Sequence, residues 1–230
     1  MMIRLVPVWP ILCCLISTGC VQSEADRPPA RPPSISATAA SATRPVGELD
    51  PAARFFTIRD RARKITYVVN MSVNLERFDD VRCELGRTIA ALDPAQSFNI
   101  VLVGGAKQQW LTRRFLLPAN SRNKELALKH IESYYVSGMY DCCDLFRDIF
   151  AQEPQVVYFL ADGFIGAKDQ VRLCTELAKA RRIRVNTLGY VSGNLKPEAG
   201  DLDFLDSLKM LARESGGTFR QLTDSDLSPQ

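Results

Sequence analysis

Apolar runs of strand length alternate with segments of helical periodicity over the last two thirds of the chain. Residues 65–70 form an almost uninterrupted apolar run, and residues 75–92 then place apolar side chains three or four positions apart, as on one face of a helix. Asn74 stands where that helix needs a cap. The alternation continues with expected strands at 98–103, 156–161, 185–189 and 218–222, and with expected helices at 120–135, 141–150, 169–181 and 202–215. Strands that are apolar along their whole length, between helices, indicate a parallel sheet with helices on both faces.

Three local patterns add detail to this sheet. Segment 111–117 is expected to be a short edge strand turned back on strand 98–103. Gly216 and Gly217 follow the last helix, where a left-handed C-cap is needed. The apolar side of the helix at 120–135 is expected to consist of Leu126, Leu128, Ile131 and Tyr134.

Polar side chains follow two of the expected strands at their carboxyl ends. Asn70, Ser72 and Asn74 come at the end of the first strand, spaced two apart, and Asp162 comes directly after strand 156–161. In doubly wound parallel sheets, ligands bind outside the carboxyl ends of the strands, near the point where the strand order reverses. We therefore expect Asn70 and Asp162 to be neighbours at one edge of the sheet.

The order of these elements resembles a von Willebrand factor type A (VWA) domain over about residues 64–223. The matching segments are YVVNMSVN (67–74) for the family's strand ending in Asp-x-Ser-x-Ser, FNIVLV (98–103) for its second strand, FLADG (159–163) for its Thr-Asp-Gly tip, and LARESGGTF (211–219) for its closing helix and strand. The resemblance implies an α/β fold with a doubly wound, mostly parallel sheet, helices on both faces and one antiparallel edge strand.

The resemblance also implies a place for a metal-ion-dependent adhesion site, in which a partner's acidic group completes the shell of a divalent cation. Asn70, Ser72, Asn74 and Asp162 stand at ligand positions, and Met139 stands where the family has a loop threonine. Mg²⁺ prefers hard oxygen ligands and its affinity depends on ligand charge, whereas a thioether is soft. We expect no cofactor, with weak binding of Mg²⁺ or another divalent cation as the alternative, in which Asp141 or Asp144 replaces a missing ligand.

A purely structural role for the same residues is the favoured interpretation. Asn70, Ser72 and Asn74 would hydrogen-bond the strand tip and cap the next helix, and Asp162 would accept backbone N–H bonds at a turn. A partner-binding surface is expected around Met139, Tyr140, Asp141 and Phe164, since aromatic side chains near a site often anchor an interface.

The N-terminal segment is expected to direct export. Residues 1–19 have the basic start, short apolar run and small residues of a signal peptide. Residues 15–20 (LISTGC) resemble a bacterial lipobox, which makes Cys20 the lipidation site, and residues 20–53 form a Pro/Ala/Ser-rich linker. The folded domain is expected at 54–224 and a tail at 225–230. The expected location is the cell envelope, anchored by lipid and facing the periplasm, with simple secretion as the alternative.

Charge and motifs exclude several classes of function. A net charge of +3, from 29 basic and 26 acidic residues, is too small and too mixed to indicate nucleic-acid binding. No Gly-x-Gly-x-x-Gly or Gly-Lys-Ser/Thr motif is present, so no nucleotide is expected. The basic run Arg59, Arg61, Arg63 and Lys64 is a candidate contact with anionic head groups, although a solvated approach to the first strand is favoured.

Cysteine and histidine content leaves little for enzymatic chemistry. Cys83, Cys142, Cys143 and Cys174 remain after the leader and Cys20, either as disulfides or as buried thiols. The single histidine, His130, is expected on a helix without a catalytic role. We therefore predict no enzyme but a non-catalytic, membrane-tethered module that binds a protein partner through loops at the carboxyl edge of the sheet, without strong metal dependence. A cation-dependent VWA module is the alternative, and a metal-assisted hydrolase is the less favoured one.

Overall fold

The computed structural model describes residues 53–71, 74–104, 107–133, 143–193 and 203–227. These residues all belong to one compact unit, 45–230. Ser72, Met139, Tyr140 and Asp141, together with Cys20 and the leader, lie outside the described residues. No helix in the described ranges is long and apolar enough to cross a membrane.

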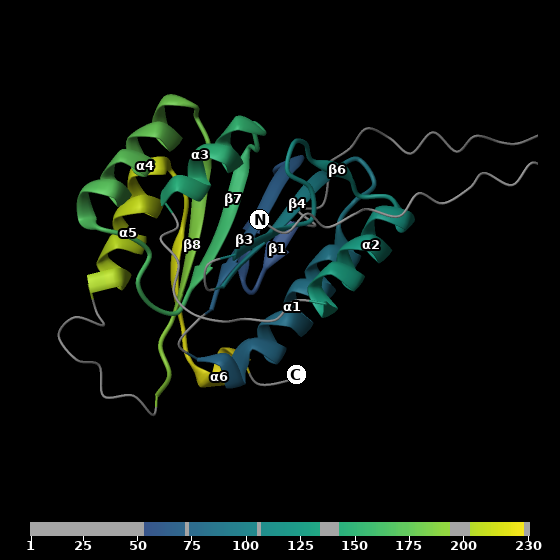
Figure 1. Cartoon of the computed structure of the whole chain (residues 1–230), viewed down its shortest axis with the longest axis horizontal. Helices are drawn as coiled ribbons and strands as arrows, with labels where there is room; N and C mark the ends of the chain where they lie inside the picture. The colour runs from purple at the N-terminus through teal and green to yellow at the C-terminus, as the bar shows by residue number, and fades with distance from the viewer. Residues whose placement is uncertain (1–52, 72–73, 105–106, 134–142, 194–202, 228–230) are drawn as a thin grey trace, which may run out of the picture. The chain divides into compact units, whose positions relative to one another are not determined.

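The centre of the domain is a mixed sheet in the order β5-β4-β3-β7-β8-β9 (Figure 1). Its parallel strands are β3 (Lys64–Asn70), β4 (Ser97–Gly104), β7 (Val156–Ala161), β8 (Arg184–Tyr190) and β9 (Phe219–Leu222). β5 (Lys107–Trp110) and β6 (Leu117–Pro118) pair antiparallel with β4. The strand order reverses between β3 and β7, which makes their carboxyl ends the switch point of the sheet. The expected doubly wound α/β fold is confirmed.

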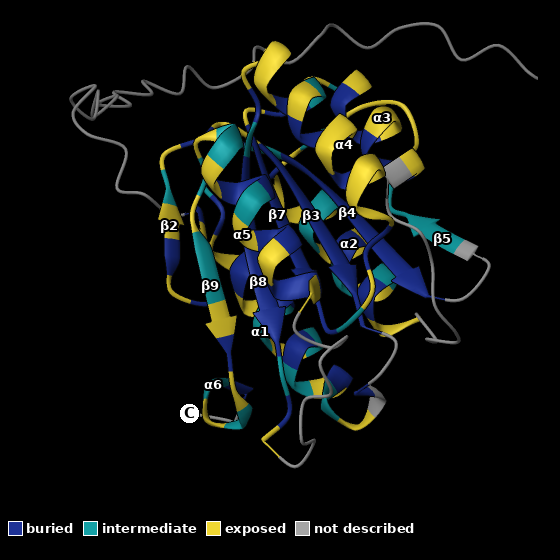
Figure 2. Cartoon of the chain, turned by 90° about the vertical axis from the view of Figure 1, so that its left-hand side faces the viewer, coloured by how far each residue is buried: buried dark blue, intermediate teal, exposed yellow. Residues whose placement is uncertain are grey.

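Helices cover both faces of the sheet, and its central strands β3, β4, β7 and β8 are almost entirely buried (Figures 1 and 2). One face is covered by α3 (Cys143–Ala151), α4 (Lys168–Ala180) and α5 (Asp203–Ser215). The other face is covered by α1 (Phe78–Ala91), α2 (Ser121–Glu132) and the short α6 (Asp224–Leu227). The 3₁₀ turn η1 (Leu75–Arg77) precedes α1. Because the helices present exposed residues outward and buried ones to the sheet, two apolar layers result.

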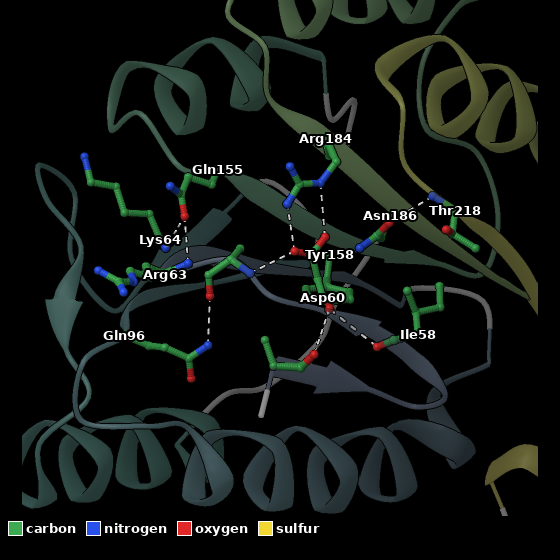
Figure 3. A network of polar contacts seen from close by, with 12 residues as sticks. Ile58, Asp60, Arg63, Lys64, Gln96, Gln155, Tyr158, Arg184, Asn186 and Thr218 are labelled. Atoms are coloured by element: carbon green, nitrogen blue, oxygen red, sulfur yellow. Dashed lines mark hydrogen bonds and ion pairs between the residues drawn. The ribbon is translucent and has the colours of Figure 1, made fainter. Parts of the chain in front are cut away.

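A two-stranded hairpin, β1 (Ala53–Phe55) and β2 (Ile58–Asp60), completes the face that carries α1 and α2. Phe55 is fully buried, with its ring centroid 5.6 Å from that of Tyr67 and 6.1 Å from that of Tyr158. The Tyr158 hydroxyl donates to the carbonyls of Ala53 and Ile58, at 3.2 and 3.4 Å (Figure 3). The hairpin is therefore part of the domain core, where the sequence indicated only an approach to the first strand.

An ion pair fixes the hairpin to the amino end of the sheet. Both oxygens of Asp60 accept from Arg184, the first residue of β8, at 3.2 Å from Nε and 2.7 Å from Nη2 (Figure 3). Such a two-point pair positions the guanidinium and the carboxylate in one plane. As a result, β2 ends at the amino edge of the sheet.

Several local expectations differ from the structure. The edge strand is β5, at 107–110; of the expected segment 111–117, Leu111 donates its N–H to the carbonyl of Ile100 and Leu117 belongs to the two-residue β6. On α2, Ala127 and Ile131 are the buried residues, whereas Leu126 is 50% exposed. By contrast, Gly216 has φ +77°, the left-handed conformation expected at the end of α5.

Candidate functional site

The candidate site lies at the carboxyl ends of β3 and β7. These strands pair in parallel with Asn70 opposite Ala161, and the N–H of Asp162 donates to the carbonyl of Asn70 at 3.3 Å. Asn70 is 1% exposed and Asp162 is 5% exposed. The structure thus brings together the two strand tips that the sequence analysis expected to be neighbours.

The Asp162 carboxylate is bound by the loop that follows β3. Its Oδ2 accepts the backbone N–H of Asn74 at 2.7 Å and the side-chain amide of Asn74 at 3.4 Å. Asn74 is itself only 3% exposed. Both N–H groups of Asn74 thus point to one oxygen of this buried carboxylate, and hydrogen bonds to a charged acceptor are the stronger kind. Asp162 makes the contact with a backbone N–H that its structural interpretation predicted, while its role as a metal ligand stays a prediction.

Asn74 does not cap α1, contrary to the expectation from sequence. The N-cap of α1 is Arg77, which makes no side-chain capping bond, and η1 lies between Asn74 and the helix. The carbonyl of Asn74 accepts the N–H of Arg77 at 3.1 Å, while its side chain turns to Asp162. The Asn74 amide therefore connects the loop after β3 to the loop after β7, and the 3₁₀ turn η1 precedes the first residue of α1.

The donor set at this edge is poor in charge. Asp162 is the only one of the four proposed ligand positions that carries a carboxylate; Asn70 and Asn74 offer amide oxygens. Among the described residues, no group of three His, Cys, Asp or Glu side chains is placed to hold a metal ion. Cation affinity at an oxygen site depends on the number of charged ligands. The proposed ligand Ser72 and the loop position Met139 stay predictions.

A second polar cluster holds neighbouring loops at the same edge. The Tyr190 hydroxyl, at the end of β8, donates to Oδ1 of Asp224, while Oδ2 accepts the N–H of Gly193 at 3.0 Å. Arg77 donates to the carbonyl of Asp224 at 3.0 Å. These bonds connect the segments that follow β3, β8 and β9, and they hold these loops in place at the carboxyl edge.

The same cluster shifts two ionisation equilibria. Burial first, and the hydrogen bond to Asp224 second, raise the pKa of Tyr190 to about 12. The hydrogen bond from Tyr190, followed by that from the N–H of Gly193, lowers the pKa of Asp224. Tyr190 therefore remains a neutral donor and Asp224 an ionised acceptor, which preserves the contact. Tyr190 and Asp224 carry no local sequence signal for this role, because the contact joins segments that are 34 positions apart.

Phe164 is the described member of the expected partner surface. It is 52% exposed in the loop after β7, two residues beyond Asp162, while the next residue, Ile165, is 3% exposed and packs in the core. An aromatic ring that projects from a loop anchored on both sides presents apolar area at little entropic cost. Tyr140 and Asp141 lie outside the described residues and remain predictions.

The remaining reactive groups lie away from this edge or outside the described residues. Cys83 is an exposed free thiol on α1, and Cys174 is buried on α4. His130 is half-buried near the end of α2, and burial lowers its pKa, partly offset by a hydrogen bond that the imidazole donates to the backbone carbonyl of Gln109. The side chains of Cys142 and Cys143 are not described. The disulfide alternatives therefore stay open.

Comparison with known proteins shows the fold. No family model and no curated protein matches the sequence. A von Willebrand factor type A protein from Catenulispora acidiphila matches with a TM-score of 0.56 and 14% identity over 74% of this chain and 41% of that one. The pilus adhesin SpaC from Lactobacillus rhamnosus GG, in an open conformation, matches with a TM-score of 0.53 and 10% identity over 73% and 29% of the two chains.

A third structure is proximal thread matrix protein 1 from the mussel byssus, with zinc in its metal-ion-dependent adhesion site (MIDAS) motif. It matches with a TM-score of 0.50 and 13% identity over 72% of this chain and 45% of that one. This chain spans less than half the length of each of these three structures. At such low identities the likeness shows a VWA-type, Rossmann-like fold. It does not identify a ligand or a partner of this chain.

Proposed function

We propose that this chain is a non-catalytic, VWA-like interaction module that is tethered to a bacterial membrane. It binds a protein partner through the loops at the carboxyl edge of the sheet and does not depend strongly on metal. Adhesion-type structures are among those with the same fold, which supports an interaction role. The tether is the segment before residue 54, with Cys20 as its lipidation site.

The observation that carries this proposal is the pair of bonds from Asn74 to Asp162 Oδ2. In a cation-dependent site, the carboxylate must be available to the ion or to its water shell. Here one oxygen is occupied by N–H donors of the same chain, and the other proposed ligands are uncharged. These contacts support a carboxyl edge that does not need a cation to hold its loops together.

Phe164 supplies the contact that we assign to the partner. Interface hot spots are enriched in aromatic side chains surrounded by well-packed neighbours. Phe164 stands between the buried Asp162 and the buried Ile165, so its ring is presented from a fixed loop. We expect it to lie at the centre of the contact.

The experiment is site-specific photocrosslinking in the cell envelope. A photoreactive phenylalanine replaces Phe164 in the full chain, and in a matched control it replaces Leu173, which is 60% exposed on α4 and belongs to another surface. We expect a discrete protein adduct from position 164, with the same yield in chelator, and none from position 173. Equal adduct patterns at both positions, or an adduct that disappears in chelator, would contradict the proposal.

A cation-dependent VWA module is the second candidate, favoured by the zinc-occupied site of the mussel protein and by the position of Asp162 at the switch point. Substitution of Asp162 by Ala separates the two. The metal-independent module retains most of its position-164 adduct, whereas the cation-dependent module loses it. A metal-assisted hydrolase, the less favoured third candidate, would show a turnover that vanishes in the same variant.

A further inference from the structure

The amino edge of the sheet, opposite the candidate site, is strongly basic. Lys64 begins β3 and Arg63 directly precedes it, while Arg181 and Arg182 follow α4; all four are exposed residues. None of the four forms an ion pair with another residue in the described part of the chain. We call these four residues the basic edge. Their charges are available to an external anion.

Gln155 holds this basic edge in place. Its Oε1 accepts the N–H of Arg63 at 2.7 Å and that of Lys64 at 3.3 Å, and its carbonyl accepts the N–H of Arg184 at 3.2 Å (Figure 3). Lys64, Arg181 and Arg182 also line one open groove of about 560 Å³, together with Glu153 and Gln155. The positive groups of two separate segments thus share one surface.

The hairpin carries two more basic residues, one position from the Ala53–Asp60 pair that lies at the amino edge of the sheet. Arg54 and Arg59 are directly opposite each other across β1 and β2, and both are exposed. Like charges in a cross-strand pair are destabilising. The nearby carboxylate, Asp60, is already paired with Arg184. An anionic surface outside the protein would relieve this repulsion.

Helix electrostatics explain only part of the pattern. Basic residues at 181 and 182 offset the negative end of the α4 dipole. That effect does not account for Arg63 and Lys64, which start a strand, or for the Arg54 and Arg59 pair in the hairpin. The clustering on one edge therefore calls for a partner of opposite charge.

We infer that the basic edge docks on an anionic lipid bilayer surface. Ala53, the first described residue, is in register with Asp60 at this same edge, so the point where the proposed tether attaches lies beside the basic edge. This inference rests on the membrane tether of the proposed function. With the basic edge on the bilayer, the carboxyl edge with Asp162 and Phe164 faces away from it, toward a partner.

The strength of such docking suits a tethered domain. Each basic residue near an anionic surface changes membrane partitioning by about fivefold, from about 1 kcal/mol per Lys or Arg. A tether makes the contact intramolecular, so weak attraction is sufficient to hold an orientation. A nucleic acid is less suited, because the net charge of the whole chain is only +3.

The test is co-sedimentation of the full chain, carrying Cys20→Ser to prevent acylation, with vesicles. Vesicles of phosphatidylcholine alone give the background from the leader, and vesicles with added phosphatidylglycerol give the electrostatic part. The edge variant is Lys64→Gln/Arg181→Gln/Arg182→Gln. The matched control, Lys129→Gln/Lys168→Gln/Arg172→Gln, removes three exposed charges from the later part of α2 and the first turns of α4. Thermal melts establish that both variants are folded.

We expect preferential binding to the anionic vesicles, reduced on the order of a hundredfold in the edge variant and little in the control. The preference for anionic vesicles should vanish at about 1 M salt, where the Debye length is only about 3 Å. Equal binding to both vesicle types, equal losses in the two variants, or binding to a soluble polyanion without binding to anionic vesicles would overturn the inference. A normal vesicle result with no Phe164 adduct would instead reject only the partner-binding proposal.

Discussion

Asn74 and Asp162, 88 positions apart in the sequence, meet at the switch point of the sheet, where Asn74 donates two hydrogen bonds to one carboxylate oxygen. This contact joins the loop after β3 to the loop after β7. It occupies one oxygen of the Asp162 carboxylate with donors from the protein itself. The geometry explains how an edge with few charged ligands keeps a defined shape.

Substitution of Asp162 by Asn should destabilise the fold by about 1–3 kcal/mol, because a buried charged acceptor is replaced by a neutral amide that also carries donors. Urea denaturation measures the loss. Asp206→Asn is the control, since this carboxylate is 75% exposed and pairs with Lys209 on the surface. Its change should stay within about 0.5 kcal/mol. Similar losses in both variants would mean that the contact with Asn74 contributes nothing.

Truncation of Phe55 to Ala should cost about 3–5 kcal/mol, the usual loss for a large aromatic removed from a core. Its ring is fully buried against Tyr67 and Tyr158. The neighbouring Arg54→Ala removes an exposed side chain and should change stability little, or raise it by relief of the repulsion with Arg59. If Phe55→Ala were as mild as Arg54→Ala, the hairpin would not belong to the cooperative unit.

The two glycines after α5 should differ in their tolerance of Ala. At Gly216 a Cβ meets nothing within 4 Å, so only the left-handed φ of +77° opposes it, at about 1–2 kcal/mol. At Gly217 a Cβ would lie 2.1 Å from the carbonyl oxygen of Val185, so the helix end must move away from β8. We expect Gly217→Ala to cost about 3 kcal/mol or more. Thermal denaturation of the two variants would refute this if their order were reversed.

Stability should fall on mild acidification through His130. Burial places its pKa in the folded state below the ordinary value, so the unfolded chain binds the proton more readily. The contribution is therefore fully present above about pH 6.5, the ordinary value, and is lost as the pH falls through the lower pKa of the folded state. Urea denaturation at a series of pH values, on the native chain and on His130→Asn, measures this. An unchanged slope in the variant would assign the effect to carboxylates such as Asp224.

The sheet and the carboxyl edge that carries the candidate site could be predicted from the sequence, because both depend on local patterns of apolar and polar residues. Uninterrupted apolar runs and helical spacing predicted β3, β7 and the three helices that cover one face within a residue or two. The polar residues after β3 and β7 predicted the meeting of Asn70 and Asp162. Parallel strands bring their carboxyl ends to one edge, so no knowledge of side-chain contacts was required.

What sequence did not predict depends on partners distant in the chain. Strands β1 and β2 have three residues each, too short for a periodic signal, and their stability comes from contacts with Tyr158 and Arg184. Asn74 had two competing uses, a helix cap and a bond to Asp162, and only the tertiary fold decides between them. Likewise, β5 (Lys107–Trp110) is mostly polar, so its sequence pattern predicts a loop and not a strand.

Whether the carboxyl edge is independent of metal is tested most directly by thermal unfolding. The native full chain and the variant Asn70→Asp are compared in chelator and with increasing Mg²⁺ or Mn²⁺. An ion that binds only the folded state stabilises it by about 2.7 kcal/mol at a hundredfold excess over its dissociation constant. We predict no shift for the native chain, and for Asn70→Asp a lower midpoint in chelator that the ion raises, because a second buried carboxylate beside Asp162 needs a cation. A midpoint of the native chain that rises with the ion along this mass-action curve would contradict the account.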